Sequence, residues 1–418
     1  MNQQFQEARW LRLSKPPISA PFETLRERPH PLRVNSLILL ILLSFALFSC
    51  PSQPDGLKDP NDLTGASANA LRLYNYILDN YFETIISGQQ DTSWTTNASN
   101  DMIARVYRDV NKYPAIKGFD LIQLPYANSP YFGGKEQIDE AIEWWEGKNN
   151  GVKLLPDQPD IHGIVTFCWH WRVRDQAAGD GNGYNFYTYT PNGDHQNDGT
   201  RFTIPWNNTT KQLDKTSPKW TSIVNDLDKV AALLKLLQDK EIPVLWRPLH
   251  EAAGNYTPGN PNGWFWWGAT GPEPYIALWE FIYDYFTVDK ELDNLIWVWN
   301  GQHRDWFPDP RTVDIVSYDR YAQNYGSQST YFSMTNNMIK DDAGRIVALS
   351  ENGRIPDPDN CKKDDAMWSW FCTWNDSSTN GFWSGEEFNT QAHKTHVYNH
   401  DLVITLDELP DITKYRLE

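Results

Sequence analysis

Two glutamates of this chain follow short apolar runs that have the character of buried strands. Glu251 ends the segment WRPLHE (246–251), and Glu351 lies one hundred residues later in VALSENG (347–353). The aromatic segment WFWWG (264–268) follows the first glutamate. Two carboxylates raised from two strand ends can act as acid/base and nucleophile in glycoside hydrolysis. Tryptophan faces supply the apolar surface on which sugar rings pack.

Other polar and aromatic side chains also stand just after apolar runs. Any one of them could be an ordinary loop cap, but their joint occurrence at the same end of several strands indicates a site. They are His170, His250, Asn300, His303, Asp319, Tyr321 and Trp374.

The two glutamates need different environments to divide the chemistry. An acid must keep its proton near neutrality, so we expect burial beside Trp246 and Trp264 to raise the pKa of Glu251. A nucleophile must stay ionised, and Tyr321 is the expected donor to Glu351. Arg247 lies on the same strand face as Glu251 by parity. It could either tune a carboxylate or form a buried ion pair inside the fold.

Eight apolar runs alternate with amphipathic segments. Nearly continuous apolar strands alternating with helices indicate parallel pairing, and eight such units predict an α/β fold, a (β/α)8 TIM barrel forming a single catalytic domain. A doubly wound open sheet is the alternative, but no glycine-rich phosphate fingerprint follows any run. The predicted strands are 84–89, 116–121, 163–170, 243–248, 295–300, 313–319, 346–351 and 367–374. The predicted helices are 67–82, 100–111, 135–147, 222–238, 274–286 and 386–398.

Composition limits the possible partners. The net charge is −17 and no basic patch stands out, so nucleic acid is excluded as a partner. No His-x-His or His-Glu-x-x-His spacing occurs, so we expect no metal and no cofactor. Cys361 and Cys372 could pair in an oxidising compartment or remain buried thiols. We expect a monomer.

The N-terminal region is expected to lie outside the fold. Residues 37–48 form an apolar run too short to span a bilayer but suited to a signal peptide, and the run leads into LFSC (47–50). This end resembles a bacterial lipobox, with Cys50 as the lipidated residue; an ordinary cleaved signal peptide is the alternative. The expected organisation is an export signal over 1–50, whose length suggests an over-extended start site, a tether over 51–64 and a catalytic domain over 65–418. The only expected membrane contact is this lipid anchor, at the periplasm or the cell surface.

The motifs around the glutamates resemble those of glycoside hydrolase family 26, the β-mannanase family of the retaining glycosidases. RPLHE (247–251) and WFWWG (264–268) match its strand-four motif, and DRY (319–321) matches its strand-six pattern. The resemblance covers the chain from about residue 67 onwards. It implies that Glu251 is the acid/base and Glu351 the nucleophile. The residues implied to bind substrate are His170, His250, Trp264, Asp319, Tyr321, Trp374, Arg247 and Trp169.

One departure from the family pattern concerns the loop after Glu251. Family members commonly have only a few residues before the aromatic segment, whereas here twelve intervene (252–263). This loop and the long segment 172–220 both follow strand ends, where barrel enzymes place their sites. Tyr256 could stack on a sugar, or the loop could point away from the cleft.

The expected activity is retaining endo-β-1,4-mannan hydrolysis, with mannan, glucomannan or galactomannan as the polysaccharide partner. The alternatives are a β-1,3-xylanase, a mixed-linkage β-glucanase or a mannobiose-releasing exo-enzyme of the same family. A different class, a glycan-binding surface lipoprotein, is disfavoured because both glutamates are present.

Overall fold

Eight parallel strands close into a barrel, as the sequence predicted. Each barrel strand falls within or overlaps one predicted run, and the strands follow one another around the barrel in chain order. They are β2 (Gly88–Gln90), β3 (Ile116–Asp120), β6 (Ile164–Cys168), β11 (Val244–Arg247), β12 (Leu295–Trp299), β13 (Ile315–Arg320), β14 (Ile346–Asn352) and β15 (Phe371–Thr373).

The structure is a computed structural model, and it describes the greater part of the chain after residue 55. The predicted export signal, Cys50 and part of the tether lie outside the described residues, as does most of the loop 252–263. The described residues are 56–59, 62–63, 65–92, 101–124, 134–174, 184–190, 195, 199–254, 256, 263–341, 343–376 and 381–417.

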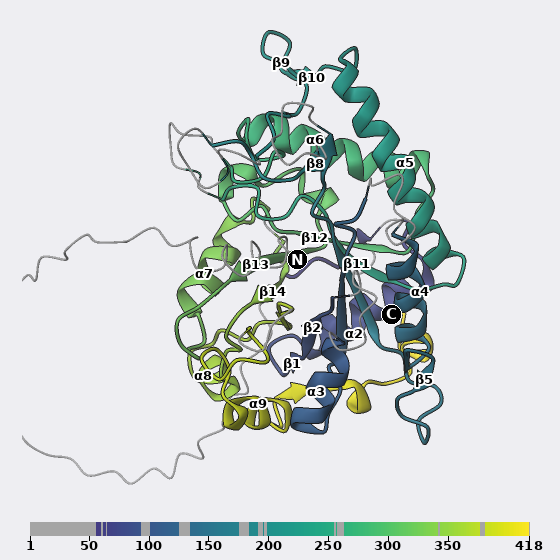
Figure 1. Ribbon diagram of the computed structural model, residues 1–418, viewed down its shortest axis with the longest axis vertical. Helices are drawn as coiled ribbons and strands as arrows, with labels where there is room; N and C mark the ends of the chain where they lie inside the picture. The colour runs from purple at the N-terminus through teal and green to yellow at the C-terminus, as the bar shows by residue number, and fades with distance from the viewer. Residues whose placement is uncertain are drawn as a thin grey trace, which may run out of the picture. The chain divides into compact units, whose positions relative to one another are not determined.

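Helices cover the outside of the barrel. In Figure 1, α4 and α5 lie on one side of the strands, and α7 and α8 lie on the other. The two helices α7 and α8 were not predicted, because short polar sequences such as STYFSMTNNM carry a weak helical period. The helices are α2 (Ala68–Asn80), α3 (Met102–Val110), α4 (Lys135–Trp145), α5 (Pro218–Gln238), α6 (Pro272–Asp284), α7 (Ser329–Met338), α8 (Pro358–Lys363) and α9 (Gln391–Tyr398).

Helix α5 shows how local sequence produces these elements. Ser217 caps its first turn by accepting from the Lys219 N–H, and Pro218 takes the first helical position, where no N–H is needed. Its buried residues Ile223, Leu227 and Val230 recur at helical spacing, so one apolar face packs against the barrel.

Short pieces complete the fold. β1 (Ile85–Ile86) pairs with β16 (Val403–Ile404), so the first predicted run is divided between this pair and the barrel. Three small antiparallel pairs are β4 (Lys148–Asn149) with β5 (Val152–Lys153), β7 (Val173–Arg174) with β8 (Tyr184–Asn185), and β9 (Trp206–Asn207) with β10 (Gln212–Leu213). Single turns of 3-10 or π-helix occupy Tyr285–Asp289, Arg304–Trp306, Pro310–Thr312, Leu406–Glu408 and Ile412–Lys414.

The structure decides between the two states expected for Cys361 and Cys372. Cys168, Cys361 and Cys372 are buried free thiols, so the alternative of a Cys361–Cys372 disulfide is wrong.

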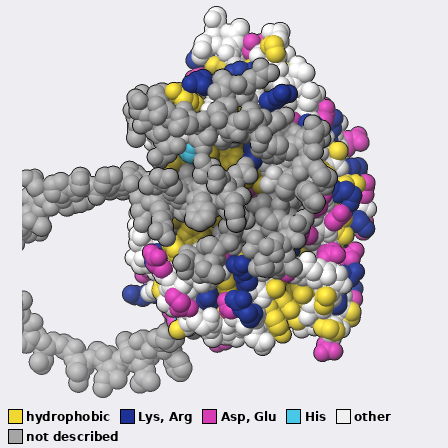
Figure 2. Space-filling model, viewed as in Figure 1, with side chains coloured by type: hydrophobic (Ala, Val, Ile, Leu, Met, Phe, Trp, Pro, Cys, Tyr) yellow, Lys and Arg dark blue, Asp and Glu magenta, His cyan; other side chains and the backbone are white. Residues whose placement is uncertain are grey.

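Within the described part, no helix combines the length and apolarity needed to cross a bilayer. On the face in Figure 2, acidic and basic side chains are interspersed along the described surface.

Candidate active site

Glu251 and Glu351 meet at the carboxyl end of the barrel strands. Glu351 lies near the end of β14, and Glu251 lies in the turn just after β11. Each glutamate is 4% exposed. Together with Asp319 they place carboxylate oxygens within 4.8 Å of one another. The mouth of the barrel therefore holds three buried carboxylates in one cluster.

Arg247 is the cation of this cluster. Its guanidinium donates to Asp319 Oδ2 at 2.7 Å and to Glu351 Oε1 at 2.5 Å. Both roles considered for Arg247 are thus present at once, since the buried ion pair and the carboxylate contact share one side chain. The prediction that Arg247 and Glu251 share a strand face was wrong, however, because β11 ends at Arg247 and Glu251 lies beyond it in a turn.

That turn holds Glu251 in an unusual backbone conformation. Leu249 and Glu251 both have φ of 50°, in the left-handed region that non-glycine residues seldom adopt. The backbone N–H of Glu251 donates to Asn300 O at 2.7 Å and lies 3.0 Å from Asn300 Oδ1. Such strain persists only where neighbours hold it, and it is common at functional sites.

A β-bulge brings Glu351 into the barrel. Tyr318 pairs with Leu349, whereas Asp319 pairs with Glu351, so Ser350 is an extra residue on β14. Ser350 bonds Asp319 Oδ1 at 2.6 Å, while Glu351 bonds Arg247. A regular strand would send these two neighbours to opposite faces, and the bulge lets both point inward.

Tyr321 donates to Glu351 Oε2 at 2.7 Å, which is the hydrogen bond that we expected. Glu351 therefore accepts from Tyr321 on one oxygen and from Arg247 on the other. Both donors favour the ionised carboxylate. Burial raises the pKa of the Tyr321 hydroxyl, and the neighbouring Glu351 and Glu251 raise it further, so it remains a donor.

Glu251 has the opposite environment. Burial raises the pKa of Glu251 well above its ordinary value, and the charges of Asp319 and Glu351 add to this effect. Arg247 and a hydrogen bond from Gln302 oppose it without reversing it. Burial likewise raises the pKa of Asp319 to about 7, against the opposing charge of Arg247. The environment of Glu251 therefore favours its protonated form.

Of the two tryptophans predicted beside Glu251, Trp264 lies near the turn that carries Glu251, and Trp246 does not. Trp264 lies against Gly254 in the turn that carries Glu251, where a methyl group on Gly254 would meet the ring at 2.2 Å. Trp246 points the other way and packs on Phe286 outside the barrel, with ring centroids 6.2 Å apart. Its neighbour Arg247 faces inward, and successive strand residues alternate, so Trp246 cannot wall the site.

Trp169 also differs from expectation. Its ring stacks on Trp171 at 4.2 Å and is 1% exposed, so it offers no open face to a sugar. Trp171 in turn donates to Asp226 of α5, which places this stack between barrel and helix. Trp374 lies beside His170, with the two ring centroids 5.7 Å apart.

Two histidines form a second buried group beside the carboxylates. Nδ1 of His170 lies 2.6 Å from Asp120 Oδ2, and its Nε2 lies 3.3 Å from Nε2 of His250. Trp267 donates its indole N–H to the His250 carbonyl at 2.8 Å. The predicted pair is thus brought together, with Asp120 as an unpredicted third member.

His303 remains at the rim of the site. Its side chain is 39% exposed and packs against Tyr256, with ring centroids 4.7 Å apart. The residues that sequence reasoning missed are Asp120, Gln302 and Ser350. Asp120 ends a predicted strand, so the strand-end rule could have found it. The other two depend on a turn and a bulge that no local pattern signals.

The described residues include three groups whose donor atoms could approach a metal ion. In the carboxylate cluster, Arg247 already supplies the positive charge. In the second, Asp120 and His170 already use their facing atoms on each other. The third is a surface group of Asp359, His396 and His400. There the backbone N–H of Leu402 donates to His400 Nδ1.

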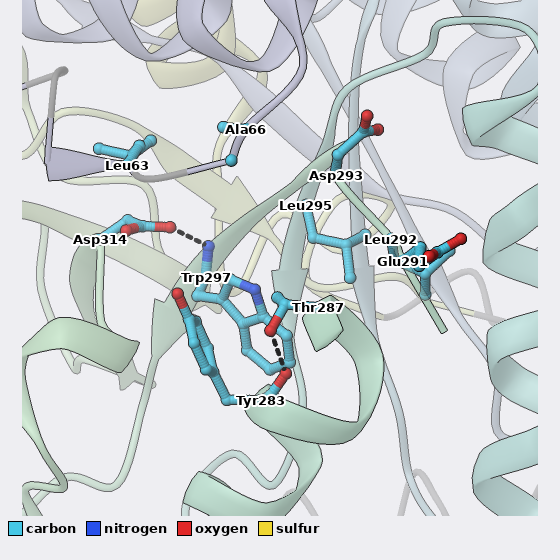
Figure 3. Close-up of a pocket in the computed structure, with 11 residues that line it drawn as sticks. Leu63, Ala66, Tyr283, Thr287, Glu291, Leu292, Asp293, Leu295, Trp297 and Asp314 are labelled. Carbon is cyan, nitrogen blue, oxygen red and sulfur yellow. Dashed lines mark hydrogen bonds between the residues drawn. The ribbon is translucent and has the colours of Figure 1, made fainter. Parts of the chain in front are cut away.

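Two further cavities lie away from the carboxylates. One of about 310 Å³ is lined by Leu295 at the start of β12 and Asp314 before β13, at the opposite end of the barrel from Glu351. Figure 3 shows Asp314 accepting from the Trp297 backbone N–H there. Another of about 660 Å³ lies between β9 and the start of α6. Neither is lined by a predicted site residue, so neither replaces the candidate site.

The (β/α)8 barrel, with two buried glutamates at the carboxyl ends of its strands, has the arrangement of carboxylates that glycoside hydrolysis requires. Comparison with known families gives the particular assignment. The model of "Glycosyl hydrolase family 26" matches residues 63–408, and the chain belongs to this family.

Individual relatives agree with the family assignment. The chain is 34% identical over 351 residues to a mannan endo-1,4-β-mannosidase of Thermothelomyces thermophilus, covering 82% of this chain and 62% of that protein. It is 31% identical to mannan endo-1,4-β-mannosidase A of Piromyces sp., covering 82% and 49% of the two chains. This chain therefore spans about half to three fifths of the length of these relatives.

Solved structures show the same fold. A β-(1,4)-mannanase of Podospora anserina superposes with a TM-score of 0.68 at 32% identity, covering 87% of this chain and 72% of that one. A β-mannanase from a symbiotic protist of the termite Reticulitermes speratus, solved with a gluco-manno-oligosaccharide, also gives 0.68 at 28% identity. It covers 86% of this chain and 100% of that one.

Proposed function

We propose that this chain is a retaining endo-β-1,4-mannanase that hydrolyses mannan, glucomannan or galactomannan. The observation that carries the proposal is the close pair Glu251 and Glu351, whose oxygens approach within 4.8 Å in opposite electrostatic environments. Retaining enzymes hold their carboxyl groups about 5–5.5 Å apart, whereas inverting enzymes need about 6.5–9.5 Å to admit a water. The names of the relatives support mannan as the substrate.

In the proposed first step, protonated Glu251 gives its proton to the glycosidic oxygen as the bond to the anomeric carbon breaks. Ionised Glu351 attacks that carbon and forms a covalent glycosyl ester. In the second step, Glu251 takes a proton from water, whose oxygen displaces Glu351 from the sugar. Arg247 and Tyr321 stabilise the departing carboxylate by donating to its two oxygens.

The strongest test is hydrolysis of a panel of polysaccharides by the chain from residue 51 onwards, with reducing-sugar detection. We expect release from mannans and none from β-1,3-xylan or mixed-linkage β-glucan. Glu351→Gln is the matched inactive control. Preferential release from one of the other polymers would replace mannan as the substrate. Binding of mannan without release by the wild type would favour a glycan-binding protein.

The pattern of products decides between endo and exo action. An endo-enzyme lowers the viscosity of a galactomannan solution early, when few reducing ends have formed. An exo-enzyme releases mannobiose from the start and leaves the viscosity nearly unchanged. We expect the first result. Early accumulation of mannobiose alone would contradict it.

We also propose that the chain is exported and lipid-anchored through Cys50, a role supported only by the sequence LFSC (47–50). A labelled fatty acid supplied to bacteria expressing the full chain should be incorporated into the wild type and not into Cys50→Ser. Equal labelling of the two, or labelling of neither, would exclude this anchor.

A further inference from the structure

Asp120, His170 and His250 form a chain of contacts across three neighbouring barrel strands. Asp120 ends β3, while His170 follows β6 and His250 follows β11. Asp120 Oδ1 accepts the backbone N–H of His170 at 3.0 Å, and its Oδ2 lies 2.6 Å from Nδ1 of the same ring. This double contact fixes both the position and the orientation of the His170 ring.

The positions of the protons follow from the partners. An ionised carboxylate can only accept, so Nδ1 of His170 must carry a hydrogen. The two Nε2 atoms of His170 and His250 lie 3.3 Å apart, and only one hydrogen fits between them. When both rings are neutral, that hydrogen belongs to His250, and Nδ1 of His250 is a bare acceptor.

A further proton changes this arrangement in one defined way. The proton binds Nδ1 of His250, and the hydrogen on Nε2 of His250 passes to Nε2 of His170. His170 then becomes the cation, held by Asp120, and His250 stays neutral with its hydrogen moved to Nδ1. One proton has been gained, and the charge lies beside the carboxylate that compensates it.

We propose that Asp120 is a positioning residue that, through His170, determines which ring nitrogen of His250 carries the hydrogen. Asp120 touches neither His250 nor Glu251 in the contacts described above, so it acts only through the intervening ring. His250 directly precedes Glu251 in the chain. The inference therefore concerns the hydrogen-bonding character of the site beside the proposed acid.

The surroundings of the two rings favour a positive charge on His170 rather than on His250. Burial disfavours the cationic form of His170, but the charge and hydrogen bond of Asp120 outweigh it and raise the pKa of His170. Glu351 adds to the rise, and Arg247 opposes it. Burial lowers the pKa of His250 far below its ordinary value, as do His170 and Arg247.

The other groups packed around the rings do not supply an alternative charge. Phe186, Phe265 and Trp374 contact His170 with their ring edges. Among the described residues, Cys168 also approaches Asp120 and His170, and burial raises the pKa of its thiol well above the ordinary value, which favours the neutral thiol. Asp120 is thus the anion that compensates a charged His170.

The change of tautomer alters the hydrogen-bonding character of Nδ1 of His250. It is buried, and no described residue makes a hydrogen bond to it. As an acceptor it can receive a hydroxyl hydrogen, and as a donor it can give one. That a sugar hydroxyl meets this atom rests on the proposed function; the tautomer change itself does not.

Side-chain 15N spectra of the histidine-labelled full chain test the tautomer directly, because protonated and bare ring nitrogens resonate far apart. The His250 signals are assigned by their loss in His250→Gln. In the wild type, His250 should carry its hydrogen on Nε2 at high pH and on Nδ1 at low pH. The change should share its midpoint with the titration of His170. A His250 tautomer that is the same at both ends of that titration would overturn the proposal.

Asp120→Asn removes the anion with little change of shape. The shared midpoint should fall by about 1 to 2 pH units, which corresponds to the loss of one hydrogen bond to a charged group. Asp226→Asn is the matched control, since Asp226 is also a buried aspartate but bonds Trp171. An equal shift in both variants, or in neither, would exclude a specific role for Asp120.

His170→Gln provides a second route if Asp120→Asn does not fold. Without an imidazole at position 170 there is no site for the added proton. His250 should then keep a single tautomer across the pH range in which the wild type changes. A His250 that still changes tautomer in this variant would show that the contact with His170 is not the cause.

The pH profile of mannohexaose hydrolysis gives a separate functional readout. In Asp120→Asn the midpoint of any KM change with pH should move by the same 1 to 2 units as the spectra. A wild type that does not cleave mannohexaose but shows the tautomer change would refute the proposed function and leave this inference standing. A spectral switch without any pH-dependence of KM would show that Nδ1 of His250 does not meet the sugar.

Discussion

The two ends of strand β14 illustrate how differently this barrel treats buried charge. At the amino end, Arg345 precedes the strand and bonds Asp341 and several backbone carbonyls. Nearby, Lys58 pairs with Asp314 at 2.8 Å, one cation for one anion. At the carboxyl end, Arg247 is the one cation among the described residues that pairs with Asp319 and Glu351, with Glu251 as a third acid beside them.

The two ends of β14 therefore differ in whether their buried charges are balanced. In a balanced buried pair each charge is compensated by its partner, and removing one partner leaves an uncompensated buried charge. Where buried carboxylates outnumber cations, repulsion between their charges raises the pKa of at least one of them. The raised pKa of Glu251 follows from that imbalance as well as from burial. Of the two ends of β14, the carboxyl end is the one at which burial and charge raise the pKa of carboxyl groups.

Replacing Glu351 with Gln should have the largest effect at the unbalanced end. Turnover of polysaccharides and of activated aryl glycosides should both fall by at least about 10⁴-fold, because the covalent ester cannot form. Initial rates on both substrate types measure this. A variant that retains activity on either type would remove Glu351 as the nucleophile.

Replacing Glu251 with Ala should distinguish the two acids. Polysaccharide turnover should fall by about 10²–10⁴-fold, while a substrate whose leaving group needs no proton should still give its first-step burst. The basic limb of the pH–rate profile should also disappear, since the raised pKa of Glu251 keeps its proton up to that limb in the wild type. Pre-steady-state kinetics against pH test both outcomes. Loss of the burst as severe as in Glu351→Gln would reverse the assignment.

Removing the cation at each end compares the two regions directly. Arg247→Met leaves two buried carboxylates without their cation and should cost about 3–5 kcal/mol in the free energy of unfolding. Lys58→Met leaves only Asp314 unpaired, which still accepts the Trp297 N–H, so its loss should be smaller. Urea unfolding of both variants gives the two values. Equal losses would show that the charge excess does not distinguish the ends.

The pH-dependence of the Arg247→Met loss sharpens the comparison. Burial already raises the pKa of Asp319 to about 7 against the pull of Arg247, so removing the cation raises it further. The folded state then binds a proton that the unfolded chain, with an Asp pKa of about 3.9, releases. Stability must therefore decline as pH rises between these two pKa values. The variant should lose more at pH 8 than at pH 5, and a loss independent of pH would contradict this.

Tyr321→Phe should have a moderate effect confined to the carboxyl end. One hydrogen bond to a charged group contributes about 1.5–3 kcal/mol, which corresponds to roughly 10- to 100-fold in rate. The fold should be retained, because the hydroxyl alone is lost. Turnover and the acidic limb of the pH–rate profile are the measurements. An unchanged rate with an unshifted limb would remove Tyr321 from the mechanism.

Shortening the loop 252–263 to three residues should have the smallest effect. Tyr256 packs against His303 at the rim of the mouth, with ring centroids 4.7 Å apart, so the loop adjoins the site without supplying a charge. We expect a changed length distribution of products from mannohexaose at a similar rate. An identical product pattern would mean that the loop points away from the cleft.

The amino-acid sequence by itself predicted the eight barrel strands and the described α-helices other than α7 and α8. Apolar runs ending in polar residues specify eight buried strands, because a barrel strand is covered on both faces and only its end is free to carry function. The Tyr321–Glu351 bond was predictable for the same reason, since both residues stand at strand ends.

Tertiary structure decided the groups whose positions depend on irregular backbone or on pairing across strands. Trp246 and Arg247 are neighbours on β11 and must face opposite ways, and the contacts of Arg247 with Asp319 and Glu351 show that Arg247 is the one that faces the site. Glu251 lies in a left-handed turn and Ser350 in a bulge, and neither breaks the local pattern of residue types. The partnership of Asp120 with His170 joins residues fifty positions apart, so only closure of the barrel brings them within 2.6 Å. Local sequence carries periodicity, whereas proton positions depend on long-range contacts that form only when the strands close.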